Sequence, residues 1–133
     1  MMLDGKKLDL KKVKIPVYNL ATREDHIAPA KSVFVGSKLF GGDVTYVVSG
    51  SGHIAGVVNP PDKKKYQYWT NGPVSGEYED WMANATETAG SWWPNWQSWI
   101  LANDDRMVEP RPPGGNQLNP IEEAPGSFVR VRV

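Results

Sequence analysis

Two loops of this chain carry side chains that could move a proton. The first, residues 22–29, contains Asp25 followed by His26, and the second, residues 49–56, contains His53 in a glycine-rich run. A histidine can take a proton from a nucleophile, while a carboxylate at its other ring nitrogen fixes the tautomer and stabilises the imidazolium that forms. Asp25 and His53 are therefore candidates for the acid and the histidine of a catalytic triad.

Each of these loops follows a segment that is typical of a β-strand. Residues 13–21 and 44–48 are rich in β-branched and aromatic side chains. Between them, residues 30–40 place apolar side chains at helical spacing, and Gly41-Gly42 follows as a stop signal. A strand, a helix and a second strand normally form a right-handed crossover between parallel strands. We therefore expect both loops at the C-terminal edge of one sheet, where open α/β sheets place their catalytic groups.

The second half of the chain is rich in tryptophan. All six Trp residues fall between positions 69 and 99. Residues 77–89 and 92–102 are predicted to form helices, with Gly90-Ser91 as the break between them. The second of these helices carries four Trp residues at the spacing of one helix face, which indicates packing against a sheet: Trp92, Trp93, Trp96 and Trp99.

The last segment of the chain differs again in composition. Residues 109–126 are rich in proline and glycine, so we expect an extended tail there. Residues 128–133 alternate apolar side chains with arginine, which predicts a short edge strand. We accordingly expect one α/β unit over residues 1–108 and a tail over residues 109–133.

The overall composition excludes several classes of protein. The chain of 133 residues is 40% hydrophobic and 23% charged, which is typical of a globular domain. Basic and acidic residues balance at fifteen each, so a nucleic acid is not expected as a partner. The absence of Cys excludes a disulfide, a thiolate metal site and a cysteine nucleophile within this sequence. No metal-ligand cluster, signal peptide or membrane span is evident, and we expect a cytoplasmic protein.

Three sequence runs resemble, in order, three motifs of the class I polyhydroxyalkanoate synthases. They are E-D-H-I-A-P at residues 24–29, G-S-G-H-I-A-G-V-V-N-P-P at 50–61 and G-S-W-W-P-N-W at 90–96, and the similarity runs from about Leu8 onward. The resemblance implies the C-terminal part of an α/β-hydrolase catalytic domain: a strand-helix-strand unit, Trp-rich helices and an extended tail. It also implies that Asp25 and His53 are catalytic, and it implies no cofactor.

The family's reaction transfers a 3-hydroxyacyl group from coenzyme A to a cysteine and then extends a polyester chain. By that resemblance His53 deprotonates the cysteine, Asp25 supports His53, and His26 is a substrate-proximal or loop-shaping residue. The implied partners are 3-hydroxyacyl-CoA, the growing polyester, the remaining N-terminal part of the enzyme and a second subunit of a homodimer. The implied location is the cytoplasm, at the surface of a polyester granule.

The family's nucleophile is missing from this sequence. It belongs to an upstream G-x-C-x-G elbow, and the chain contains neither a Cys nor a G-x-S-x-G motif. We therefore expect a fragment without synthase activity of its own. Two alternatives remain open: part of another α/β hydrolase, such as a thioesterase or a depolymerase, and a noncatalytic module that binds polyester through its Trp-rich face. The run Asn59-Pro60-Pro61 and the G-S-W-W motif favour the synthase.

Overall fold

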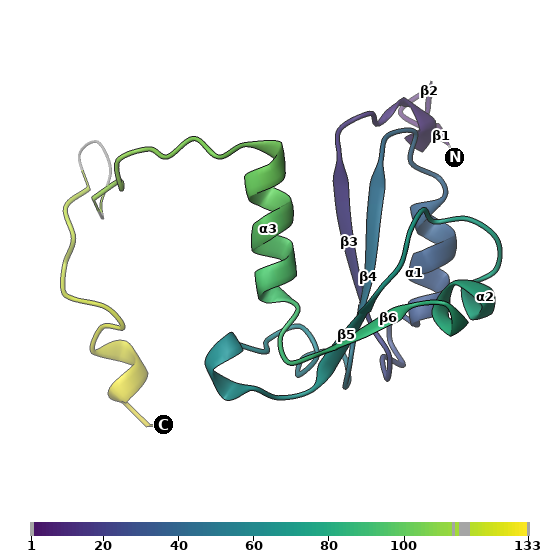
Figure 1. Ribbon diagram of the computed structural model, residues 1–133. Coiled ribbons are helices and arrows are strands. Elements are labelled where there is room, and N and C mark those ends of the chain that lie inside the picture. Colours follow the sequence, from purple (N-terminus) through teal and green to yellow (C-terminus); the bar gives the residue numbers. More distant parts are fainter. Residues whose placement is uncertain (1, 113, 115–117, 133) are drawn as a thin grey trace.

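A four-stranded sheet in the order β3-β4-β5-β6 forms the centre of the molecule (Figure 1). β3 (Val17–Thr22) and β4 (Val44–Ser49) are parallel, and α1 (Ala30–Ser37) connects them. The strand-helix-strand unit expected from the sequence is therefore confirmed, although α1 ends at Ser37 rather than at residue 40. Because the two strands are parallel, the loops that follow them leave the sheet at the same edge.

Two further strands extend this sheet. β5 (Gln67–Thr70) pairs antiparallel with β4, and β6 (Thr86–Ala89) pairs antiparallel with β5. The helix predicted over residues 77–89 is wrong in its second half, because α2 (Tyr78–Ala83) ends before β6 begins. Asn84 ends the helix by bonding back to the Asp80 carbonyl, and the β-branched threonines beyond it suit a strand.

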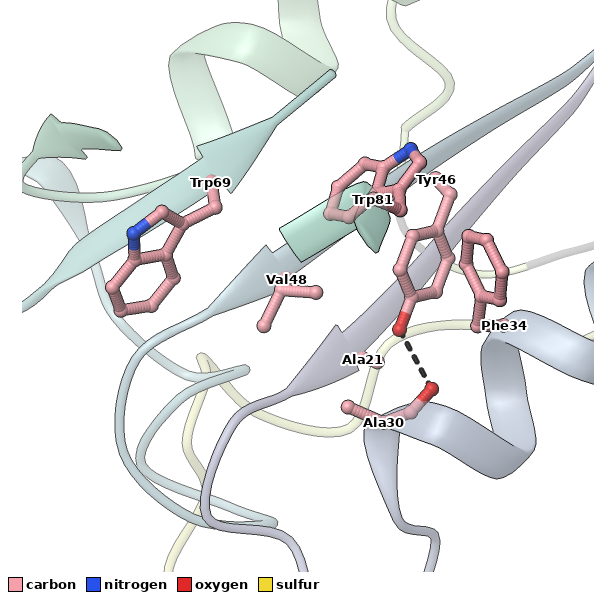
Figure 2. Close-up of a cluster of buried hydrophobic side chains, with 7 residues drawn as sticks. All are labelled: Ala21, Ala30, Phe34, Tyr46, Val48, Trp69 and Trp81. Atoms are coloured by element: carbon pink, nitrogen blue, oxygen red, sulfur yellow. Dashed lines mark hydrogen bonds between the residues drawn. The ribbon is translucent and has the colours of Figure 1, made fainter. Parts of the chain in front are cut away.

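One face of the sheet is covered by α1 and α2 (Figure 1). The core between them contains Phe34, Tyr46 and Trp81, each at most 4% exposed, whose rings meet edge to face or tilted (Figure 2). The Tyr46 hydroxyl donates a hydrogen bond of 2.7 Å to the Ala30 carbonyl, so its polar end is satisfied inside this core. Val48 and Trp69 complete the same layer.

The other face of the sheet is covered by α3 (Trp93–Asn103) (Figure 1). Tyr18 of β3 packs on the rings of Trp92 and Trp99, with ring centroids 6.0 and 5.5 Å apart, and its hydroxyl donates to Asn95 at 2.8 Å. The prediction that the Trp-rich helix packs on the sheet is therefore confirmed. Ser91 supports the start of this helix, because its hydroxyl accepts the Trp93 backbone N–H.

The computed structural model describes residues 2–112, 114 and 118–132. Position 1 of the predicted unit 1–108, and positions 113, 115–117 and 133 of the predicted tail 109–133, lie outside the described residues. The N-terminus forms a small hairpin of β1 (Met2–Leu3) and β2 (Lys6–Lys7), and short 3-10 helices cover Leu10–Lys12 and Pro61–Lys63. After α3 the described residues are almost all exposed. Within the described residues, none of the helices is long and apolar enough to cross a membrane.

The edge strand predicted over residues 128–133 is wrong in its described part. Phe128–Arg130 form a 3-10 helix, with the Arg130 N–H bonded to the Ser127 carbonyl. The side chains of Phe128 and Val129 are exposed. The alternation of apolar and charged residues therefore does not correspond to the buried and exposed faces of a sheet. A strand needs a partner for its backbone groups, and a short local turn satisfies some of those groups without one.

Candidate active site

The loops after β3 and β4 lie side by side at the C-terminal edge of the sheet. The parallel pairing continues past the strand ends, because Arg23 N–H bonds to the Ser49 carbonyl at 2.8 Å and Glu24 N–H to the Ser51 carbonyl at 3.0 Å. The backbone therefore fixes the distance between the two loops before any side chain contributes. This pairing places Asp25 across from the loop that carries His53.

Asp25 is held in place by its own loop. Its Oδ1 atom accepts the backbone N–H groups of Ile27 at 2.8 Å and Ala28 at 2.9 Å, an arrangement that aspartate commonly adopts in turns. The second carboxylate oxygen, Oδ2, lies 2.7 Å from His53 Nδ1. The expectation that both loops lie at the same edge of the sheet is therefore confirmed, and their two candidate residues are in contact, whereas their catalytic roles stay a prediction.

The electrostatics of the pair define which atom carries the proton. Hydrogen bonds from the Ala28 N–H and from His53 lower the pKa of Asp25 to about 2, so the carboxylate is ionised at neutral pH. An ionised carboxylate only accepts hydrogen bonds, so His53 Nδ1 must be the donor. In the neutral imidazole Nε2 then carries no proton. Such an unprotonated ring nitrogen can accept a proton when the histidine acts as a general base.

Solvent reaches the two partners very differently. The Asp25 side chain is 7% exposed, while the His53 side chain is 47% exposed. The carboxylate is thus largely shielded from solvent, and the imidazole remains accessible to a molecule from outside. This is the arrangement that an acid–histidine pair needs when the reacting group belongs to another part of a protein or to a substrate.

The histidine loop depends on close backbone packing. Gly56 is buried, and a Cβ atom there would lie 2.5 Å from the Gly50 carbonyl oxygen and 2.6 Å from Thr22 Cγ2. In this loop the positive φ, of 69°, belongs to Ser51 rather than to a glycine beside His53. The glycine at position 56 is required instead because any side chain would separate the bases of the two loops.

His26 lies apart from the pair. It is exposed, and within the described part of the chain its side chain makes no hydrogen bond, so the structure does not bring it together with Asp25 and His53. Exposed apolar side chains lie in the two loops and just after the second: Ile27 is 66%, Ile54 73% and Val58 63% exposed. We call these three exposed side chains the apolar rim.

The sequence interpretation missed the hydrogen bonds that hold the histidine loop from outside. The indole N–H of Trp92 donates to the Gly56 and Val57 carbonyls, and that of Trp93 donates to Val57. The tryptophan spacing indicated only a packed helix face. A buried indole N–H usually needs an acceptor, so the tryptophans themselves indicated that such bonds exist. The sequence does not say which carbonyl accepts them.

Other features of the molecule lie elsewhere. A cavity of about 600 Å³ lies at the opposite end of β4 from His53, and its lining includes Val44, Thr45 and Lys38. Within the described residues no three His, Cys, Asp or Glu side chains gather as a metal site requires. The acid–histidine pair is therefore the feature with the clearest chemistry.

Comparison with known proteins shows which sequences this chain resembles. No protein-family model matches the chain. The chain is 70% identical over 132 residues, 99% of its length, to the poly(3-hydroxyalkanoate) polymerase subunit PhaC of Rhizobium etli, and 66% identical to that of Rhizobium meliloti. It is 36% identical over 129 residues to the corresponding subunit of Cupriavidus necator. The chain covers 21 to 22% of these relatives. By sequence the chain belongs to the poly(3-hydroxyalkanoate) polymerase family and spans about a fifth of the length of these curated members.

Proposed function

We propose that this chain provides the acid and the histidine of an acyl-transfer site that polymerises 3-hydroxyacyl groups from coenzyme A thioesters into polyester. The observation that carries the proposal is the 2.7 Å contact between Asp25 Oδ2 and His53 Nδ1 at the ends of two parallel strands. The relatives, which are named poly(3-hydroxyalkanoate) polymerases, supply the class of reaction. The same arrangement supports an α/β-hydrolase type of domain over residues 1–108, with residues 109–133 as its tail.

In this proposal His53 acts as the general base through Nε2. It takes the proton of a cysteine thiol, and the thiolate attacks the thioester carbonyl, so that a new carbon–sulfur bond forms. The bond to the sulfur of coenzyme A then breaks, and the imidazolium returns the proton to that leaving thiolate. Asp25 stays ionised throughout and stabilises the imidazolium. Chain growth follows when the hydroxyl of a 3-hydroxyacyl group attacks the acyl carbon: a carbon–oxygen bond forms, the bond to the cysteine sulfur breaks, and the hydroxyl proton passes through His53 to the cysteine thiolate.

The thiol of this reaction must come from outside this sequence. The chain contains no Cys, and it covers only about a fifth of the relatives. The exposed imidazole of His53 and the apolar rim of Ile27, Ile54 and Val58 suit a site that is completed by further residues and an acyl chain. The proposed partners are accordingly 3-hydroxyacyl-CoA, the growing polyester and the rest of the enzyme.

A graft tests this proposal. The chain replaces the corresponding segment of the Rhizobium etli relative, and release of coenzyme A from 3-hydroxybutyryl-CoA is measured. We expect an active hybrid, a loss of at least about 100-fold in kcat for His53→Gln, and a loss in the same direction for Asp25→Asn. His26→Gln is the comparison and should lose much less activity, because a substrate-proximal or loop-shaping residue does not itself transfer the proton. An active hybrid that is indifferent to His53→Gln would refute the assignment.

The isolated chain provides the complementary test. Without a thiol no acyl-enzyme can form, so we expect no polymer from 3-hydroxybutyryl-CoA. Polymer formation by pure chain that depends on His53 would contradict this account. Binding of polyester that survives replacement of both Asp25 and His53, together with an inactive hybrid, would instead favour a noncatalytic binding module.

A further inference from the structure

The C-terminal end of the histidine loop, at Gly56 and Val57, accepts hydrogen bonds from three side chains, one at the end of β4 and two at the start of α3. Ser49 Oγ donates to the Gly56 carbonyl at 2.7 Å. Trp92 Nε1 lies 3.1 Å from the same carbonyl oxygen and 3.2 Å from that of Val57. Trp93 Nε1 donates to the Val57 carbonyl at 3.0 Å. Two consecutive tryptophans of the α3 start therefore bond to two consecutive carbonyls of the loop.

The loop itself transmits this restraint to the histidine. Its backbone is closed by hydrogen bonds from Gly56 N–H to the Gly52 carbonyl at 2.9 Å and from Val58 N–H to the Ile54 carbonyl at 2.8 Å. His53 lies inside the first of these closed turns. A shift of the Gly56 carbonyl would therefore move the turn that carries the imidazole. The distance between His53 Nδ1 and the Asp25 carboxylate would change with it.

The two indoles are themselves fixed before they reach the loop. Trp92 is buried at 9% exposure and stacks on Tyr18 of β3, while the Trp93 ring meets the Trp92 ring edge to face and the Trp93 backbone N–H bonds to Ser91 Oγ. Rigid aromatic side chains lose little conformational entropy when they make such contacts. The indole donors are consequently held in place by the sheet and by the helix start, independently of the loop.

We propose that Trp92 and Trp93 are positioning residues for His53, holding the histidine loop so that Nδ1 meets the Asp25 carboxylate. This inference rests on the proposed function, because it gives the two tryptophans a role in the same site. It assigns to the Trp-rich helix a task beyond covering the sheet. A purely structural role would change the stability of the fold and leave the state of the imidazole unaltered.

The test is the tautomer of His53, which long-range ¹H–¹⁵N spectra of the full chain report at alkaline pH through the carbon-bound ring protons. The chain has two histidines, so exposed His26 serves as an internal reference. In the wild type we expect the proton of His53 on Nδ1, because Asp25 accepts it there. In the double variant Trp92→Phe/Trp93→Phe we expect the His53 spectrum to move to the pattern of His26.

Trp81→Phe is the matched control. It also removes an indole that donates to a backbone carbonyl, that of Gly72, but it lies in the core on the opposite face of the sheet. We expect it to lower stability without changing the tautomer of His53. If the double variant does not fold, Trp93→Phe alone provides the same comparison, since Trp93 is less buried than Trp92.

An unchanged Nδ1–H tautomer in the folded tryptophan variants would overturn the positioning role. The result is separable from the proposed function, because the spectrum needs neither substrate nor nucleophile. An inactive hybrid with a normal His53 tautomer would count against the proposed reaction alone.

Discussion

The two faces of the sheet are built by different means. On the face covered by α1 and α2, Phe34, Tyr46 and Trp81 are nearly inaccessible to solvent and pack as one aromatic core. On the other face, none of the residues of α3 is fully buried, and the helix is attached through ring contacts to Tyr18 and through polar bonds to a loop. From this contrast we infer that the face covered by α1 and α2 supplies most of the stability, while the other face uses part of its surface to hold the candidate site.

Phe34→Ala should produce the largest effect on stability. It removes a ring that is 0% exposed and lies in the core on the face covered by α1 and α2. We expect a loss of about 3–5 kcal/mol in the free energy of unfolding, in line with other buried aromatic truncations. Urea or thermal unfolding followed by circular dichroism measures it. Trp96→Ala on the α3 surface, where the side chain is 40% exposed, is the comparison and should cost much less. Equal losses would erase the distinction between the faces.

Gly56→Ala should produce the second largest effect, and this effect should fall on the loop that carries His53. The new methyl group would lie 2.5 Å from the Gly50 oxygen, so the loop must shift, at a cost of about 1–3 kcal/mol. We expect the hybrid enzyme carrying it to lose activity. Gly36→Ala, in α1 with no atom within 4 Å of the added carbon, is the control and should gain about 0.5–1 kcal/mol. Full activity of Gly56→Ala would show that the loop tolerates displacement.

Tyr18→Phe should have a smaller effect that is confined to one face. It removes the hydroxyl that donates to Asn95 at 2.8 Å but keeps the ring, so we expect a loss of about 0.5–1.5 kcal/mol. Amide hydrogen exchange should become faster in α3 and remain unchanged in β4. Tyr46→Phe makes the same change in the core and should instead accelerate exchange in β4 and α1. Identical exchange profiles would contradict the comparison.

The pH dependence of stability should show the smallest effect. The folded-state pKa of Asp25 is lowered to about 2, chiefly by the Ala28 N–H and then by His53. Such a group stabilises the fold above the ordinary aspartate pKa of about 4, and the contribution is lost as pH falls from there toward 2. The difference in Tm between wild type and Asp25→Asn should shrink over that interval. A difference that is constant from pH 6 to pH 2 would contradict an ionised, bonded Asp25.

The sequence predicted the parts of this fold that depend on local patterns. The strand-helix-strand unit and the helix that begins near Trp93 follow from periodicity and stop signals, and the Asp25–His53 contact follows from the parallel pairing. β5 and β6 are short strands whose pairing is set by tertiary contacts, so residues 77–89 appeared as one helix. The indole bonds to Gly56 and Val57 depend on how α3 meets a loop more than 30 residues away, which no local pattern contains.

The protonation site of the His53 ring, compared between the wild type and Asp25→Asn, tests the proposed pair most directly. In this pair the Asp25 carboxylate fixes the proton on Nδ1 and leaves Nε2 to act as the base. Long-range ¹H–¹⁵N spectra at alkaline pH should show the Nδ1–H tautomer for His53 in the wild type and a pattern like that of exposed His26 in Asp25→Asn. A His53 spectrum that already matches His26 in the wild type, and does not respond to Asp25→Asn, would contradict the account.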